Sequence, residues 1–162
     1  MKLHGLFIRG IFRSVLNEIL RAQNECSDFT AYLQPYAGAP IKMLRDNPPT
    51  FGSPIRLYLS TSEQPATVSF TADIVGWKDK TALSDTEKCR IERIIEKYQP
   101  EEGGLYNYSK VTDKPSLNLV LVQRLIKLPS PFCVTNLIKQ SDGKPYSPDQ
   151  ASPGGWSKVR LV

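Results

Sequence analysis

The sequence contains few of the residues from which metal sites and many enzyme active sites are built. Among its 162 residues there is a single histidine, His4. The three cysteines, Cys26, Cys89 and Cys133, are far apart in the sequence and form no CxxC pair. This spacing argues against a zinc site and a disulfide framework, and one histidine cannot supply an HExxH motif or a histidine cluster. We therefore expect no metal and no cofactor.

The chain also has no apparent membrane segment, secretion signal or phosphate-binding loop. The longest apolar run, Leu119 to Val122, is far shorter than the ~20 residues that cross a bilayer. Arg9 and Arg13 interrupt the apolar stretch that a signal peptide would need. The glycine pairs at 103–104 and 154–155 do not have the spacing of a nucleotide-binding loop. These absences predict a cytoplasmic protein that neither contacts membranes nor hydrolyses nucleotides.

The composition is typical of one globular domain with a modest excess of positive charge. A hydrophobic fraction of 40% and a charged fraction of 23% suit a single core, so we expect residues 1–162 to form one domain. The formal net charge of +5 favours anionic partners such as nucleic acids. Because many proteins that bind no nucleic acid carry a similar excess, charge alone does not decide the function.

The strongest local pattern is a strand pair between Ile55 and Trp77. Residues 55–60 and 66–77 each alternate apolar and polar side chains, which is the period of a strand with one buried face. A short polar loop joins them, so they predict an antiparallel hairpin. Other segments are predicted as a helix from Ile11 to Arg21, a strand from Phe29 to Tyr36, a short helix from Ala39 to Leu44, a capped helix from Ser84 to Gln99, a strand from Leu117 to Ile126, a break over 127–131, a short helix from Val134 to Lys139 and a strand from Trp156 to Val162.

This order of elements predicts an α+β fold. Long strands joined by tight loops, with helices inserted between them, favour a curved, mixed, barrel-like sheet flanked by helices. A doubly wound parallel sheet is disfavoured, because the longest strands follow one another without a crossover helix.

Aromatic and basic residues in loops and at strand ends are the main candidates for a binding site. Aromatic rings can stack on unpaired bases while cations hold the phosphates. Trp77 follows Gly76 at the expected end of a strand, and Trp156 follows a glycine turn. For both tryptophans, lining a ligand site and packing in the core remain equally open. The alternating charges of residues 87–97 instead indicate the solvated face of a helix.

The hairpin resembles the middle of the PUA-like superfamily, particularly its EVE and ASCH branches. The matching segments are IRLYLSTS at 55–62 and ADIVGW at 72–77, followed by residues 121–131 and by PGGWSKV at 153–159. The first 28 residues have no counterpart in the family pattern. The resemblance implies a small curved β-barrel with helices at its openings, which binds RNA or DNA and can lodge a modified or flipped base in a pocket.

The resemblance also implies a set of binding residues. Trp77 and Trp156 would wall the base pocket, Ser60 and Thr61 would reach the base edge, and basic side chains would meet phosphates. The implied function is a nucleic-acid-binding module that reads a modified base in a restriction, defence or RNA-processing setting. The full set is Tyr32, Lys42, Arg45, Ser60, Thr61, Trp77, Lys78, Trp156 and Lys158.

Two other functions stay open. Some ASCH-like proteins are small hydrolases, amidohydrolases or ribonucleases, that act on modified nucleosides or RNA, and Lys42, Thr61 and Glu63 are the nearest candidates for such a role. Alternatively, the first helix and exposed aromatic residues form a surface for a protein partner, for example a nuclease. We favour a binder over an enzyme and assign no catalytic residue.

Overall fold

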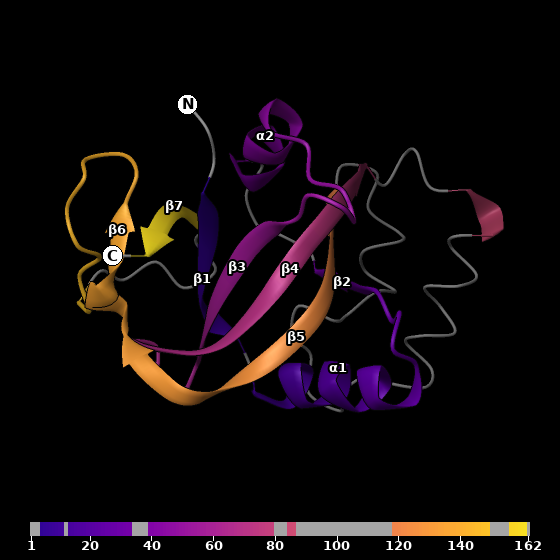
Figure 1. The fold of residues 1–162 in the computed structure, drawn as a ribbon, viewed down its shortest axis with the longest axis horizontal. Helices are drawn as coiled ribbons and strands as arrows, with labels where there is room; N and C mark the ends of the chain where they lie inside the picture. Colours follow the sequence, from indigo (N-terminus) through magenta and orange to yellow (C-terminus); the bar gives the residue numbers. More distant parts are fainter. Residues whose placement is uncertain are drawn as a thin grey trace.

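The computed structural model describes residues 4–11, 13–33, 39–79, 84–86, 118–149 and 156–161. Within these ranges, two α-helices pack against one mixed, curved sheet of seven strands in the order β2-β5-β4-β3-β1-β7-β6 (Figure 1). The elements are β1 (Gly5–Ile11), α1 (Arg13–Glu25), β2 (Ala31–Leu33), α2 (Ala39–Asp46), β3 (Ile55–Thr61), β4 (Thr67–Asp79), β5 (Asn118–Cys133), a 3₁₀ turn (Val134–Asn136), β6 (Leu137–Lys139) and β7 (Trp156–Leu161).

The predicted hairpin is confirmed. β3 and β4 pair antiparallel, from Ile55 opposite Ile74 to Leu59 opposite Phe70. Alternating apolar residues of both strands, Ile55, Leu57 and Leu59 on β3 and Phe70, Ala72 and Ile74 on β4, belong to the main core cluster. Both strands of the hairpin lie in the interior of the sheet, with β5 beside β4 and β1 beside β3.

The N-terminal segment forms a strand that the sequence pattern did not predict. β1 lies inside the sheet, parallel to β3 and antiparallel to β7. Leu6 and Ile8 are fully buried, whereas Gly10, with a φ of 79°, sits at an irregularity in the pairing with β3. Just before β1, the backbone N–H of His4 donates a hydrogen bond to Oε1 of Gln140 at 3.2 Å. Strand β1 is thus part of the core.

The C-terminal half differs from the prediction in two places. β5 continues through the expected break at 127–131 as far as Cys133. Its pairing with β4 is irregular there, since five residue steps from Lys127 to Phe132 face the two steps from Val68 to Phe70. Such a bulge accommodates Pro129 and Pro131, which cannot donate ladder hydrogen bonds. The helix predicted from Val134 to Lys139 is wrong, because only a 3₁₀ turn forms before β6 begins.

The remaining predicted elements are mostly found near their expected positions. α1 and α2 form where helices were predicted, β2 begins at Ala31 and not at Phe29, and β7 begins at Trp156 as predicted. The capped helix expected from Ser84 onward lies outside the described residues except for residues 84–86.

Both helices contribute to the same core. Val15, Leu16 and Ile19 of α1 and Leu44 of α2 belong to the cluster that covers one face of the sheet. A smaller cluster lies on the other face, formed by Phe7, Val68, Val134, Leu137, Tyr146 and Val159. The predicted α+β class with a mixed sheet and flanking helices is confirmed. The described strands do not close into a barrel, because β2 and β6 are the two edges of the sheet.

Candidate nucleic-acid interface

Helix α2 brings several of the predicted binding residues together. It contacts both β4 and β7, which are separated by β3 and β1 in the sheet. The helix is anchored by the fully buried Leu44, while Lys42 and Arg45, three residues apart on the helix, are both exposed. Arg45 lies in the last turn, where a cation interacts favourably with the helix dipole. α2 therefore presents two cations to solvent beside the ends of two strands.

Arg45 is stacked on the most accessible tryptophan of the described chain. The central guanidinium carbon of Arg45 lies 5.5 Å from the centroid of the Trp77 ring, within the range of a cation–π interaction. Trp77 does not end its strand, as the sequence suggested, because β4 continues to Asp79. Its ring is partly buried against the main core cluster. The pair joins an aromatic surface to a positive charge at the edge of α2.

The other two predicted cations lie on β4 and β7, the two strands that α2 contacts. Lys158 is exposed on β7, opposite Leu6 of β1. Lys78 follows Trp77 on β4 and is half-buried. All four cations of the predicted binding set are thus carried by α2 and the two strands that it contacts. Alternation along β4 places Lys78 on the opposite face of the sheet from Trp77. The cations of this surface are therefore Lys42, Arg45 and Lys158.

Ser60 and Thr61 are not part of this surface. Both are fully buried at the end of β3 that is remote from α2. They lie five and six residues, or about 17–20 Å, from Ile55, the first residue of the strand. The Oγ of Ser60 accepts a hydrogen bond from the Gly10 N–H at 3.1 Å, and Oγ1 of Thr61 accepts one from the Gln64 N–H at 3.2 Å. These hydroxyls satisfy the backbone at a strand irregularity and at a turn. Their burial does not agree with the expectation that they reach a bound base.

Trp156 lies on β7, two residues before Lys158, but it is buried, and Tyr32 lies on β2. Trp156 is 8% exposed and belongs to the main core cluster, which favours packing over lining an open site. Its indole Nε1 is buried without a hydrogen-bond partner among the described residues. Tyr32 is on the edge strand β2, opposite Leu121, and its side chain lies outside what the structure describes.

The residues proposed for a hydrolase do not converge. Lys42 is on α2, which precedes β3, whereas Thr61 is the last residue of β3 and Glu63 lies two residues beyond it. Glu63 forms an ion pair with Arg13, with 3.4 Å between Oε2 and Nε. The geometry therefore does not bring a lysine, a threonine and a glutamate to one reacting centre.

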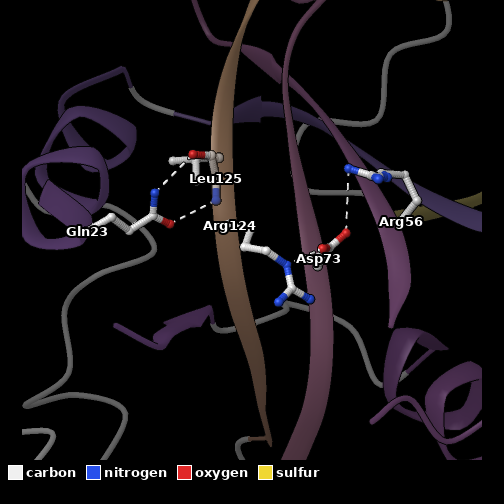
Figure 2. Close-up of polar contacts among 5 residues, drawn as sticks. All are labelled: Gln23, Arg56, Asp73, Arg124 and Leu125. Carbon is white, nitrogen blue, oxygen red and sulfur yellow. Dashed lines mark hydrogen bonds and ion pairs between the residues drawn. The ribbon is translucent and has the colours of Figure 1, made fainter. Parts of the chain in front are cut away.

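A second charged cluster, which the sequence reasoning missed, lies on the face of the sheet away from the helices. The side chain of Asp73 on β4 is 11% exposed and lies between two arginines (Figure 2). Its Oδ2 accepts a hydrogen bond from Nε of Arg124 at 2.6 Å, and its Oδ1 lies 3.5 Å from Nη1 of Arg56. About half of each arginine side chain is exposed. One buried carboxylate thus orients two guanidinium groups from the neighbouring strands.

A bulge in β5 aims Arg124 at Asp73. Between the pairs Thr71–Ile126 and Asp73–Gln123, β5 contains one residue more than β4. Arg124 has a φ of 53°, the only positive φ of a non-glycine residue in the described ranges. Glycine is the usual residue at such a position, because a Cβ makes the left-handed conformation unfavourable.

Helix α1 stabilises this bulge from the other face. The Nε2 of Gln23 donates a hydrogen bond to the Leu125 carbonyl at 2.9 Å, and the Leu125 N–H donates one to Oε1 of Gln23 at 2.8 Å (Figure 2). Both backbone groups of the residue after Arg124 are therefore satisfied by one side chain. Gln123 is held separately, since its Nε2 donates to Oγ1 of Thr30 at 2.7 Å.

Part of this cluster was readable in the sequence. Alternation along the predicted hairpin puts Arg56 and Asp73 on the same outward face, and a carboxylate in the middle of a strand is unusual. Arg124 gave no such signal, because its orientation depends on the extra residue in β5 and on Gln23, which is 101 positions away in the sequence.

Other features of the described residues add no further candidate site. They contain no group of three or more His, Cys, Asp or Glu side chains that could hold a metal ion. No helix in the same ranges is long and apolar enough to cross a bilayer. Comparisons with family models, curated proteins and solved structures found no match to this chain.

Proposed function

We propose that this chain is a nucleic-acid-binding module that contacts a strand through α2 and the adjoining parts of β4 and β7. The observation that carries the proposal is the stacked pair of Arg45 and Trp77, with the exposed lysines 42 and 158 on neighbouring elements. An aromatic ring beside cations is the combination that binds unpaired bases together with their phosphates.

The two kinds of contact have different consequences. Lysines that neutralise phosphates release counterions, so binding through Lys42 and Lys158 weakens steeply as salt is raised. Stacking on Trp77 depends little on salt and favours unpaired bases, whose faces are accessible. The proposed interface therefore prefers single-stranded segments and shows a salt dependence that reports the number of phosphate contacts.

The finer proposal is that the module is PUA-like and reads a modified or flipped base. Its support is the motif of the β3–β4 hairpin together with a curved mixed sheet that is flanked by helices. A set of oligonucleotides that differ only in one modified base tests this part separately. Equal affinities for all members would leave a general strand binder and remove the base-reading role.

The interface is tested by measuring the affinity of charge-matched variants for a single-stranded oligonucleotide by fluorescence anisotropy at several salt concentrations. The variant Lys42→Gln/Lys158→Gln removes two cations of the interface, and Arg21→Gln/Lys144→Gln removes two exposed cations outside it. We expect the first variant to lower the magnitude of the logarithmic salt slope by about 1 to 2, and the second to leave it unchanged. Equal effects of both variants, or no binding by the wild type at low salt, would show that the proposal is wrong.

A further inference from the structure

Two arginines share one carboxylate on the sheet face opposite the helices. Arg56 and Asp73 alternate with residues of the main core, so they point away from α1 and α2. Each arginine uses one nitrogen to contact Asp73, whose two carboxylate oxygens are thereby both occupied. In the described part of the chain, neither guanidinium has another ion-pair or hydrogen-bond partner.

The cluster has an unbalanced charge and unused donors. Two guanidinium groups and one carboxylate leave a formal charge of +1. Arginine has five N–H donors in a planar fork, and the contact with Asp73 uses only a small part of them. The remaining donors belong to side chains that are about half exposed. An anion can therefore reach them without displacing Asp73.

Asp73 also fixes both arginines before any ligand arrives. A mobile arginine loses rotamer freedom when it binds an anion, which weakens binding. Here the carboxylate restrains both side chains in the unliganded protein, with the shorter contact, 2.6 Å, on Arg124. The two guanidinium groups, from the strands on either side of β4, are thus held near Asp73 before a ligand binds.

The backbone around Arg124 indicates that its direction matters. The left-handed conformation at this residue is unfavourable for any side chain with a Cβ, and glycine would relieve it. The protein instead has an arginine there, and Gln23 satisfies both backbone groups of the next residue. A surface ion pair contributes little stability, so ion pairing alone is a weak reason for an arginine at this position.

From these features we infer that Arg56 and Arg124 form a binding site for a phosphate group. A single guanidinium group can bind both oxygens of a planar carboxylate. A tetrahedral phosphate has oxygens that point in several directions and can accept hydrogen bonds from two guanidinium groups on separate strands. The net charge of +1 matches a singly charged phosphodiester or part of the charge of a monoester. The site lies on the other face of the sheet from α2 and does not depend on the function proposed for α2.

The direct test is an NMR titration of the full chain with inorganic phosphate, compared with chloride at equal ionic strength. The Nε–H signal of Arg124 is the reporter. We expect a saturable shift with phosphate and none with chloride. We further expect Arg56→Lys/Arg124→Lys, which keeps both charges but loses the forks, to weaken phosphate binding about tenfold, or ~1.4 kcal/mol. Arg21→Lys/Arg160→Lys is the matched control and should bind as the wild type does.

Oligonucleotides with and without a 5′-phosphate distinguish the two sources of the group. Tighter binding of the phosphorylated strand, lost in the Arg56/Arg124 variant, assigns the site to a terminal monoester. Equal binding of both strands, weakened by the same variant, assigns it to a backbone diester. A wild type that shows no saturable phosphate shift overturns the inference, as does a lysine variant with wild-type phosphate affinity. Failure of the Lys42/Lys158 experiment leaves this titration unaffected, so the two proposals fail separately.

Discussion

Replacing Gln23 by alanine tests whether a single helix side chain maintains the β5 bulge. The change removes two hydrogen bonds, of 2.9 and 2.8 Å, to the carbonyl and N–H of Leu125. Each bond contributes about 0.5–1.5 kcal/mol net, and an N–H or carbonyl left without a partner adds to the loss. Alanine has a higher helix propensity than glutamine and returns a few tenths of a kcal/mol. We therefore expect Gln23→Ala to lower the free energy of unfolding by about 2 kcal/mol.

Urea unfolding measures this change, and the neighbouring residue provides the control. A loss of this size lowers the urea midpoint at constant slope and corresponds to a drop in melting temperature of about 4–8 °C for a chain of this length. Asn24→Ala alters the same exposed turn of α1 without touching β5 and should stay within about 0.5 kcal/mol of the wild type. If Gln23→Ala is as stable as Asn24→Ala, the side chain does not support the bulge. In an Arg124→Gly background the cost of Gln23→Ala should fall, because glycine adopts the bulge conformation without help.

Three further predictions address the charged cluster, the proposed interface and one thiol. Arg124→Gly should be more stable than Arg124→Ala by about 1 kcal/mol in urea unfolding, because only glycine adopts the left-handed backbone conformation without strain. Within a regular strand alanine is the more stable of the two, so a more stable Arg124→Ala would contradict the strain at this residue. Trp77→Leu should weaken binding of single-stranded oligonucleotides by about 1–3 kcal/mol in anisotropy, whereas Trp77→Phe retains most of the affinity, and equal losses would argue against stacking. Interactions with Thr135 lower the pKa of the exposed Cys133 thiol, so more thiolate is present at neutral pH. In a protein whose other two cysteines are replaced by serine, Thr135→Val should raise this pKa and shift the pH profile of iodoacetamide alkylation to higher pH, and an unchanged profile would refute the effect.

The strand pair was predictable because its signal is local. In β3 and β4 the apolar residues alternate over long stretches, and a short polar loop fixes the order of pairing. β1 was missed because Arg9 and Gly10 interrupt its pattern, and because a strand inside a sheet with a parallel neighbour depends on contacts with residues about 50 positions away. The same limitation applies to β5, whose prolines at 129 and 131 indicated a break that a bulge can absorb.

The candidate interface was predictable in its residue types but only partly in its membership. Lys42, Arg45 and Lys158 are exposed, as expected for phosphate contacts. The resemblance to PUA-like domains assigned Ser60 and Thr61, at the end of a strand, to a base, but each hydroxyl satisfies a backbone N–H inside the protein. A sequence pattern identifies a strand end and does not show whether that end is open to solvent or covered by another element.

Two irregularities in the pairing of β4 with β5 determine which surface each charged group occupies. The bulge at Arg124 directs a guanidinium onto Asp73, on the face away from the helices. A second shift gives β4 one extra residue, Val75, between Ile74 and Gly76. Asp73 and Trp77 are four positions apart and would share a face in a regular strand. Because one extra residue reverses the alternation, Trp77 instead packs on the core side, where Arg45 of α2 covers its ring. One strand thus supplies a residue to each of the two proposed binding surfaces.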